Sequence, residues 1–314
     1  MTSRDPEPVL LPTAEEIASF QRDFPGRPGA LQLDAAEFRV GLAMLPLFVE
    51  LGGLEPSDVV LEVGCGAGRM AYALSGHLDG GSYEGFDSIE GLIRWAQGSI
   101  GAVFPSFRFR FVPVANSVYF PEGSIAPESF TFPYSDGSFD FAIVTSVFTH
   151  IRGREIRHYL EELARVLRPG GRMFTTWFLL DEETDASIGE GRALFALKHP
   201  VEDGYTHQPD NPELVMGFRR DDASRWIEAA GLHTVAVHEG SWRGRPSRVP
   251  GQDVIVAQKP PATRSSPTRG SASRSRQREG QSSQGTPGKR SAPLAGAAGK
   301  RPARARGTGR RERQ

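Results

Sequence analysis

The chain has 314 residues, of which 38% are hydrophobic and 24% charged, as in a protein that keeps a core and carries some unfolded sequence. This length allows one large domain or two small ones, and no apolar run approaches the roughly 18 residues of a membrane-spanning helix. The formal net charge of −1 conceals two opposite parts, because residues 260–314 hold 14 Lys and Arg against 2 acidic residues, which leaves −13 for residues 1–259.

Residues 1–34 are expected to form a loose N-terminal cap. Its one short helix is predicted at TAEEIASF (13–20), where Thr13 is the N-cap and Glu16 stands three residues later. The opening MTSRDPEPVLLPT has neither a basic leader nor a sustained apolar segment. We therefore expect no secretory signal and a cytoplasmic location.

A single α/β domain is predicted over residues 35–259. It begins with a helix at 35–51 that Pro46 should kink, and it then alternates apolar runs with amphipathic segments, the order typical of a parallel sheet. Strands are expected at 59–63, 83–87, 107–112, 139–146, 171–178, 233–239 and 253–258. The clearest helices are expected at 89–97, 154–167 and 220–231, and irregular structure at 113–137, an ordered insertion, and at 198–217.

Three glycines follow the first expected strand in VLEVGCGAGRM (60–70). Gly64, Gly66 and Gly68 allow the backbone to turn tightly and to approach a ligand where the ligand crevice of a parallel sheet lies. Asp87 ends the second strand 19 residues after Gly68, and an acid there can accept hydrogen bonds from both ribose hydroxyls. The pattern predicts a site for a nucleoside-bearing cofactor.

The spacing argues against two common kinds of nucleotide site. A dinucleotide fingerprint would place its third glycine at position 69, where Arg69 stands, and no GK[ST] sequence indicates a phosphate-binding loop. A nicotinamide dehydrogenase remains open only if this spacing argument fails. The one cysteine, Cys65, excludes an internal disulfide and a multi-cysteine metal site, and we expect no metal.

Four ordered motifs resemble class I S-adenosylmethionine-dependent methyltransferases. They are EVGCGAGR (62–69), FDSIEGLIRWA (86–96), FPYSDGSFDFAIVTSVFTHI (132–151) and LARVLRPGGRMF (163–174). The resemblance covers about residues 36–258. It implies a Rossmann-like fold with a seven-stranded, mostly parallel sheet covered by helices on both faces, and S-adenosyl-L-methionine as cofactor.

The resemblance also assigns cofactor contacts. The glycine loop would lie against the methionine part, Glu62 would orient loop and cofactor amine, Asp87 would hold the ribose, and Ile89 would cover one adenine face. The alternative is that Glu62 and Asp87 only cap turns. The complete expected cofactor set is Glu62, Gly64, Cys65, Gly66, Gly68, Asp87, Ser88, Ile89, Asn116 and Thr145.

One departure concerns the adenine. The family commonly has an acid at the end of the third strand, but FVPVANS has none there. Asn116 could supply a carbonyl acceptor instead, or Glu128 could return from the insertion.

Methyl transfer from a sulfonium is an in-line displacement, so catalysis depends mainly on positioning. An alcohol acceptor also needs a general base, and His150, which follows the fourth strand, is the first candidate; alternatively it only caps the next helix. His199, His207 and Asp181 are further candidates. Four aromatic residues could receive a ring or sugar or could be ordinary core residues: Trp177, Phe178, Tyr205 and Trp242.

The preferred function is methyl transfer to a small molecule, most plausibly at a hydroxyl of a sugar or natural product. The motif [ND]-P-P-[FYW] of amine methyltransferases is absent after the fourth strand, where TSVFTH stands. The alternatives are an RNA or protein methyltransferase and a non-catalytic cofactor-binding protein.

The basic tail at 260–314 is expected to be disordered. It could capture nucleic acid or an anionic surface by charge, act as a solubilising extension, or fold back on the acidic domain.

Overall fold

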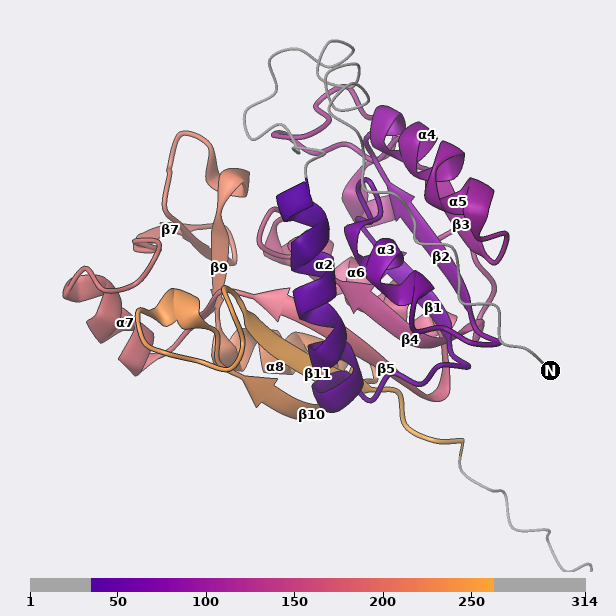
Figure 1. Cartoon of the computed structure of the whole chain (residues 1–314). Coiled ribbons are helices and arrows are strands. Elements are labelled where there is room, and N and C mark those ends of the chain that lie inside the picture. Colours follow the sequence, from indigo (N-terminus) through magenta and orange to yellow (C-terminus); the bar gives the residue numbers. More distant parts are fainter. Residues whose placement is uncertain (1–34, 263–314) are drawn as a thin grey trace, which may run out of the picture. The chain divides into compact units, whose positions relative to one another are not determined.

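The structure is a computed structural model that describes residues 35–262. Its centre is a seven-stranded sheet in the order β10-β11-β5-β4-β1-β2-β3 (Figure 1). The strands are β1 (Val59–Val63), β2 (Ser82–Asp87), β3 (Phe107–Phe111), β4 (Phe139–Val144), β5 (Leu167–Trp177), β10 (His233–His238) and β11 (Asp253–Gln258). All seven expected strands are confirmed, with small shifts at their ends.

Strand direction and order place the ligand crevice. Strand β1 pairs in parallel with β2 and β4, β2 with β3 and β4 with β5, whereas β11 runs antiparallel to both β5 and β10. The order reverses between β1 and β4, and ligands of such sheets bind beyond the carboxyl ends of the strands at that point. The expected mostly parallel, Rossmann-like sheet is confirmed.

Helices cover both faces because successive strand residues point to opposite sides. Val60 packs with α2, α3 and α4 on one face, and Leu61 packs with α6 and α8 on the other (Figure 1). The helices are α2 (Ala35–Leu47), α3 (Arg69–Ser75), α4 (Glu90–Gly98), α5 (Ile100–Val103), α6 (Gly153–Val166), α7 (Glu182–Gly189) and α8 (Arg220–Ala229), with a π-helix, η1 (Phe48–Gly52), and three 3₁₀ turns, η2 (Pro127–Ser129), η3 (Pro212–Leu214) and η4 (Ser241–Arg243).

Two local details differ from the sequence expectation. Helix α2 continues through Pro46 and changes into η1 at Phe48, so the irregularity follows the proline by two residues. Strand β5 begins at Leu167 instead of residue 171. Its RPGG segment bulges where the register to β4 shifts, and the Gly170 N–H donates to the carbonyl of Lys259 at 2.9 Å.

A second, four-stranded sheet lies beside the first and was not predicted. Its order is β6-β9-β8-β7, with β6 (Leu179–Leu180), β7 (His199–Val201), β8 (Gly204–Thr206) and β9 (Met216–Arg219). The expectation of irregular structure at 198–217 was therefore wrong, because strands of two to four residues are too short to show a periodic pattern. The insertion at 113–137 has only η2 and isolated bridges, as expected.

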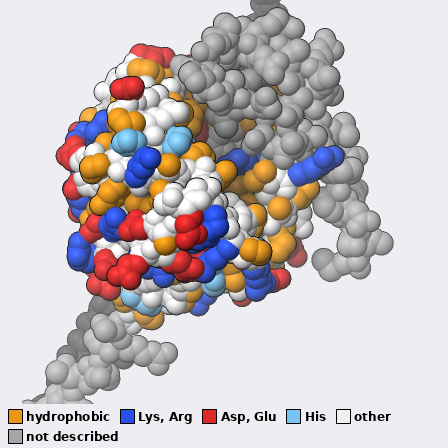
Figure 2. Space-filling model, turned by 90° about the vertical axis from the view of Figure 1, so that its left-hand side faces the viewer, with side chains coloured by type: hydrophobic (Ala, Val, Ile, Leu, Met, Phe, Trp, Pro, Cys, Tyr) orange, Lys and Arg blue, Asp and Glu red, His pale blue; other side chains and the backbone are white. Residues whose placement is uncertain are grey.

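The face that carries α7 and the second sheet shows Lys and Arg side chains among Asp and Glu side chains (Figure 2). Arg219 pairs with Asp185 at 2.6 Å and Arg154 with Glu202 at 2.7 Å.

Within residues 35–262 no helix is both long and apolar enough to cross a bilayer. The cap at 1–34, its predicted helix at 13–20 and the basic tail beyond residue 262 lie outside the described residues.

Candidate functional site

A cavity of about 320 Å³ lies at the carboxyl ends of β1, β2 and β4. It is lined by segments that directly follow these strands and β3, which is where a parallel sheet places a ligand. The expected site residues that line it are Gly64, Cys65, Gly66, Asp87, Ser88, Ile89, Asn116, Thr145 and His150. Glu62 and Gly68 do not line it.

The glycine loop has a backbone that other residues rarely adopt. Gly64 has φ 72° and Gly68, the N-cap of α3, has φ 82°. A Cβ atom on Gly64 would lie 2.4 Å from Cγ2 of Val147, so the loop packs directly against the segment after β4. These contacts hold the loop as one wall of the cavity.

Asp87 fixes this loop from the neighbouring strand. Its Oδ2 accepts the N–H of Gly66 and its Oδ1 accepts the N–H of Ile89, both at 2.8 Å. Burial raises the pKa of Asp87, and the hydrogen bonds from Gly66 and Ile89 oppose that rise. The remaining lone pairs of the carboxylate can accept hydrogen bonds from hydroxyls of a ligand.

Replacing Asp87 by alanine is expected to weaken S-adenosylmethionine binding by about 100-fold, because it removes a charged acceptor for the ribose and frees the Gly66 N–H. Calorimetric titration measures the affinity, and a thermal unfolding curve checks that the variant is folded. Asp79, exposed in the turn before β2, provides the matched control. Unchanged affinity of Asp87→Ala would rule out the ribose contact.

Glu62 lies beneath the loop and not in the cavity. It is 1% exposed, and the hydroxyl of Tyr83 donates to its Oε2 at 2.5 Å. Burial raises the pKa of Glu62 to about 8, although the hydrogen bond from Tyr83 acts in the opposite direction. The described structure thus gives Glu62 a supporting place under the loop, and its contact with the cofactor amine stays a prediction.

The structure does not support either residue proposed for the adenine contact. Asn116 lines the cavity, but its Oδ1 already accepts the N–H groups of Val118 and Tyr119, each at 3.0 Å. Its Nδ2 donates to the carbonyl of His150 at 2.9 Å. Both lone pairs of Oδ1 are used, and Glu128 is exposed and does not line the cavity.

His150 lies in the cavity wall with a defined tautomer. Its Nδ1 is 3.2 Å from the carbonyl oxygen of Glu213, and because a carbonyl only accepts, Nδ1 carries the proton and Nε2 keeps a lone pair. Burial lowers the pKa of His150 more than the carbonyls of Glu213 and Leu214 raise it. The imidazole is therefore neutral at pH 7 and can act as a base.

The side chain of Glu213, in η3, anchors the residue whose backbone carbonyl contacts His150. Its Oε2 accepts the N–H of Ser117 at 3.1 Å and the Ser117 hydroxyl at 2.5 Å, and its Oε1 accepts Nε of Arg152 at 2.8 Å. Burial draws the pKa of Glu213 upward, but the hydrogen bonds from Ser117 and Arg152 outweigh it and keep the pKa below its ordinary value. The sequence carried no sign of this role, because Glu213 lies in a segment expected to be irregular.

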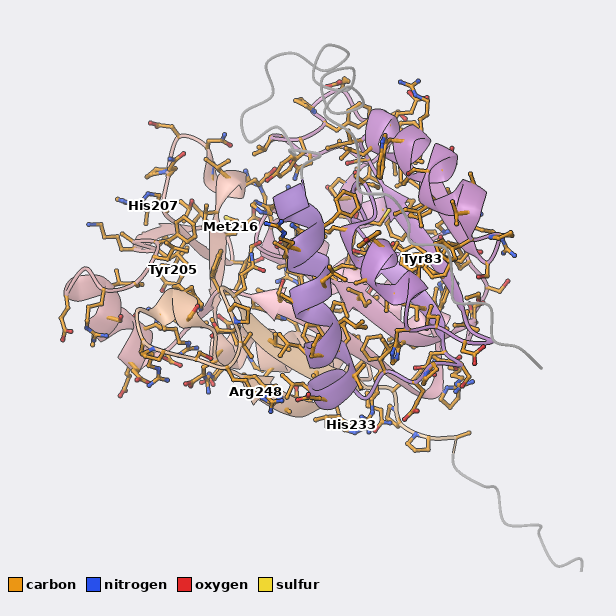
Figure 3. The ribbon with its side chains drawn as sticks, in the orientation of Figure 1. Tyr83, Tyr205, His207, Met216, His233 and Arg248 are labelled. Atoms are coloured by element: carbon orange, nitrogen blue, oxygen red, sulfur yellow. The ribbon has the colours of Figure 1, made fainter. Side chains whose placement is uncertain are left out.

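The remaining sequence candidates lie elsewhere. Figure 3 shows Tyr205, on β8, and His207, just after that strand, close together and well apart from Tyr83 on β2. Asp181 is the N-cap of α7 and accepts the Thr184 N–H at 2.9 Å. Residues that do not line the cavity are His199, His207, Asp181, Trp177, Phe178, Tyr205 and Trp242, of which Trp177 and Trp242 are buried in the core.

Several lining residues were missed by sequence reasoning: Arg69, Tyr119, Ser146 and Tyr159. Ser146 has φ 57°, an uncommon conformation that its N–H supports by donating to Oγ1 of Thr176 at 2.8 Å. In the sequence, only the position of Ser146 just after β4 could have indicated that it lines the cavity. Across residues 35–262 no group of three or more His, Cys, Asp or Glu is arranged to hold a metal ion.

Comparison with known proteins finds a family that part of this chain resembles. Residues 61–175 match the family described as "Methyltransferase domain". These residues include the glycine loop, Asp87 and His150.

Solved structures share the fold at low identity. The [4+2]-cyclase SpnF is 18% identical, with 74% of this chain and 85% of that one covered and a TM-score of 0.50. The 1,6-didemethyltoxoflavin-N1-methyltransferase of Burkholderia thailandensis, solved with 1,6-didemethyltoxoflavin and S-adenosylhomocysteine, is 20% identical over 81% of this chain and 94% of that one, with a TM-score of 0.47. A S-adenosylmethionine-dependent methyltransferase of Methanosarcina mazei is 19% identical over 66% and 95%, with a TM-score of 0.46. Because one of these proteins is named a cyclase, the fold by itself does not decide the reaction.

Proposed function

We propose that this chain, whose residues 61–175 match the methyltransferase domain family, is a class I S-adenosylmethionine-dependent methyltransferase that methylates a hydroxyl group of a small molecule. The alternative in which the basic tail captures RNA or an acidic protein stays a prediction, because that tail lies beyond the described residues. The cytoplasmic location likewise stays a prediction.

Two features of the cavity support the cofactor assignment. The glycine loop provides a wall without side chains for the methionine part, and the Asp87 carboxylate, fixed by Gly66 and Ile89, faces the place of the ribose. Its volume of about 320 Å³ lies at the lower end of the range for small-molecule sites. A small acceptor is the kind of substrate that such a space favours.

The single observation that carries the proposal is the tautomer of His150. When bound, the cofactor supplies an electrophilic methyl group on a sulfonium. His150 would take the hydroxyl proton of the acceptor at Nε2 while the oxygen forms its bond to the methyl carbon and the electrons of the breaking carbon–sulfur bond go to sulfur. The Glu213 carbonyl would hold the imidazole during this transfer.

The test uses the full chain. Calorimetric titration with S-adenosylmethionine, S-adenosylhomocysteine and NAD should show binding of the first two only. Purified chain with S-adenosylmethionine should then convert at least one member of a panel of phenols and sugars, measured as S-adenosylhomocysteine formed. Binding of NAD alone, or turnover only with amine acceptors, would contradict the proposal.

A further inference from the structure

The cavity has an apolar end beyond Asp87. The sheet order places β2 between β1 and β3, so Asp87 at the end of β2 lies between the glycine loop and the segment that follows β3. If the proposed function is right, a ribose at Asp87 with its methionine part on the glycine loop directs the adenine to the β3 side. The lining residues there are Phe86, Val112, Val114, Pro127, Ile151 and Tyr159.

The backbone of residues 112–116, on the β3 side of the cavity, has no N–H group left for a ligand. Within residues 112–116, the N–H of Val112 donates to Asp87 O at 3.0 Å and the N–H of Val114 to Val112 O at 2.8 Å. Ala115 N–H donates to Ile125 O at 2.8 Å and Asn116 N–H to Phe120 O at 3.0 Å, while residue 113 is a proline without N–H. Polar recognition of a ring here must use a side chain or a carbonyl.

Tyr159 is the side chain that meets this need. It projects from α6, is 5% exposed, lines the cavity, and packs edge-on against Phe132 with ring centroids 5.3 Å apart. Among residues 35–262 no hydrogen bond joins its hydroxyl to another residue, and the oxygen is not one of the fully buried unpaired atoms, so it is accessible from the cavity. A hydroxyl that faces a cavity and has no protein partner can form a hydrogen bond with a ligand group there.

The hydroxyl also keeps its proton. Burial, together with the negative charges of Glu155 and Asp87, raises the pKa of Tyr159 well above its ordinary value. The oxygen of a neutral phenol both donates one hydrogen bond and accepts others. It therefore suits an amino group at the edge of an aromatic ring.

We propose that Tyr159 recognises the 6-amino group of the cofactor's adenine, with its hydroxyl oxygen accepting a hydrogen bond from that group. The proposal rests on the proposed function, which supplies the cofactor. It accounts for the absence of an acid after β3, since Asn116 is occupied by its own loop and Glu128 is exposed.

The experiment compares two ligands and three proteins by calorimetry. The ligands are S-adenosylhomocysteine and the same molecule with unsubstituted purine in place of adenine. The full-length wild-type chain should bind the adenine compound about tenfold more tightly, as a hydrogen bond to an otherwise unpaired group requires. Tyr159→Phe should lose this preference, because phenylalanine keeps the ring and its packing and removes only the hydroxyl.

Tyr134→Phe is the matched control. The Tyr134 hydroxyl is buried without a side-chain or backbone partner in the described part of the chain, but Tyr134 does not line the cavity, so the tenfold preference should persist. A Tyr159→Phe variant that keeps the preference for the adenine compound, or that binds both ligands more weakly by the same factor, would overturn the role of Tyr159. The proposed function would then still stand. A wild-type chain that binds neither ligand would overturn the proposed function and this inference together.

Discussion

Replacing His150 by alanine is expected to lower turnover by about 10²–10⁴-fold while the affinity for S-adenosylmethionine changes little. The reason is that His150 lines the cavity and its Nδ1 is 3.2 Å from the Glu213 carbonyl, so that Nε2 is the ring nitrogen left with a lone pair. Single-turnover rates and calorimetric affinities, measured on the same preparations, separate loss of the base from loss of the cofactor.

The pH dependence provides a second readout. Burial lowers the pKa of His150, so the base loses its lone pair only as the pH falls below the ordinary histidine value of about 6.5. For the wild type we expect kcat/KM to decline on the acid side with a midpoint under that value, and for His150→Ala this limb should vanish. His199→Ala, on β7 and away from the cavity, is the control. Normal turnover of His150→Ala would leave His150 a purely structural role.

Replacing Asp253 by alanine is expected to lower the free energy of unfolding by about 3–5 kcal/mol, the cost of breaking a buried ion pair. Arg243 would keep its pair with the part-buried Asp181, at 2.9 Å. Asp253 is fully buried, and its Oδ1 accepts the Gly240 N–H at 2.7 Å and Nε of Arg243 at 2.8 Å. Its Oδ2 accepts the Leu179 N–H at 2.9 Å and Nε1 of Trp242 at 2.8 Å. The substitution leaves Arg243, which is 2% exposed, without this carboxylate.

Urea-induced unfolding followed by circular dichroism measures this loss. Asp222→Ala is the matched control, since Asp222 pairs with the largely exposed Arg225 on α8 and should cost at most about 1 kcal/mol. Changing Arg243 to methionine and Asp253 to leucine together should cost less than the sum of the two single changes, because neither charge is then left alone. A loss within 1 kcal/mol for Asp253→Ala would contradict the assigned role of this cluster.

The fold of the central sheet was predictable because its signals are local. Apolar runs of five to eight residues predicted all seven strands. The spacing of the glycine loop and Asp87 predicted that they would meet at one crevice, which Gly64, Gly66 and Asp87 line and Gly68 does not. The short strands β6 to β9 gave no such signal, since two to four residues show no period.

The sequence by itself predicted the class of the domain and nine of the residues on the cavity wall. These predictions depended partly on a strand, a turn and a fixed spacing and partly on the resemblance to a methyltransferase family, which also predicted the cofactor. Only the tertiary structure decided which side chains are free to act. Glu213 stands 63 residues from His150 and 96 from Ser117, and Asp253 stands 74 from Leu179, so no local pattern connects them. Whether a polar atom such as Oδ1 of Asn116 is occupied, or the hydroxyl of Tyr159 is not, follows from packing between distant segments, which sequence spacing does not encode.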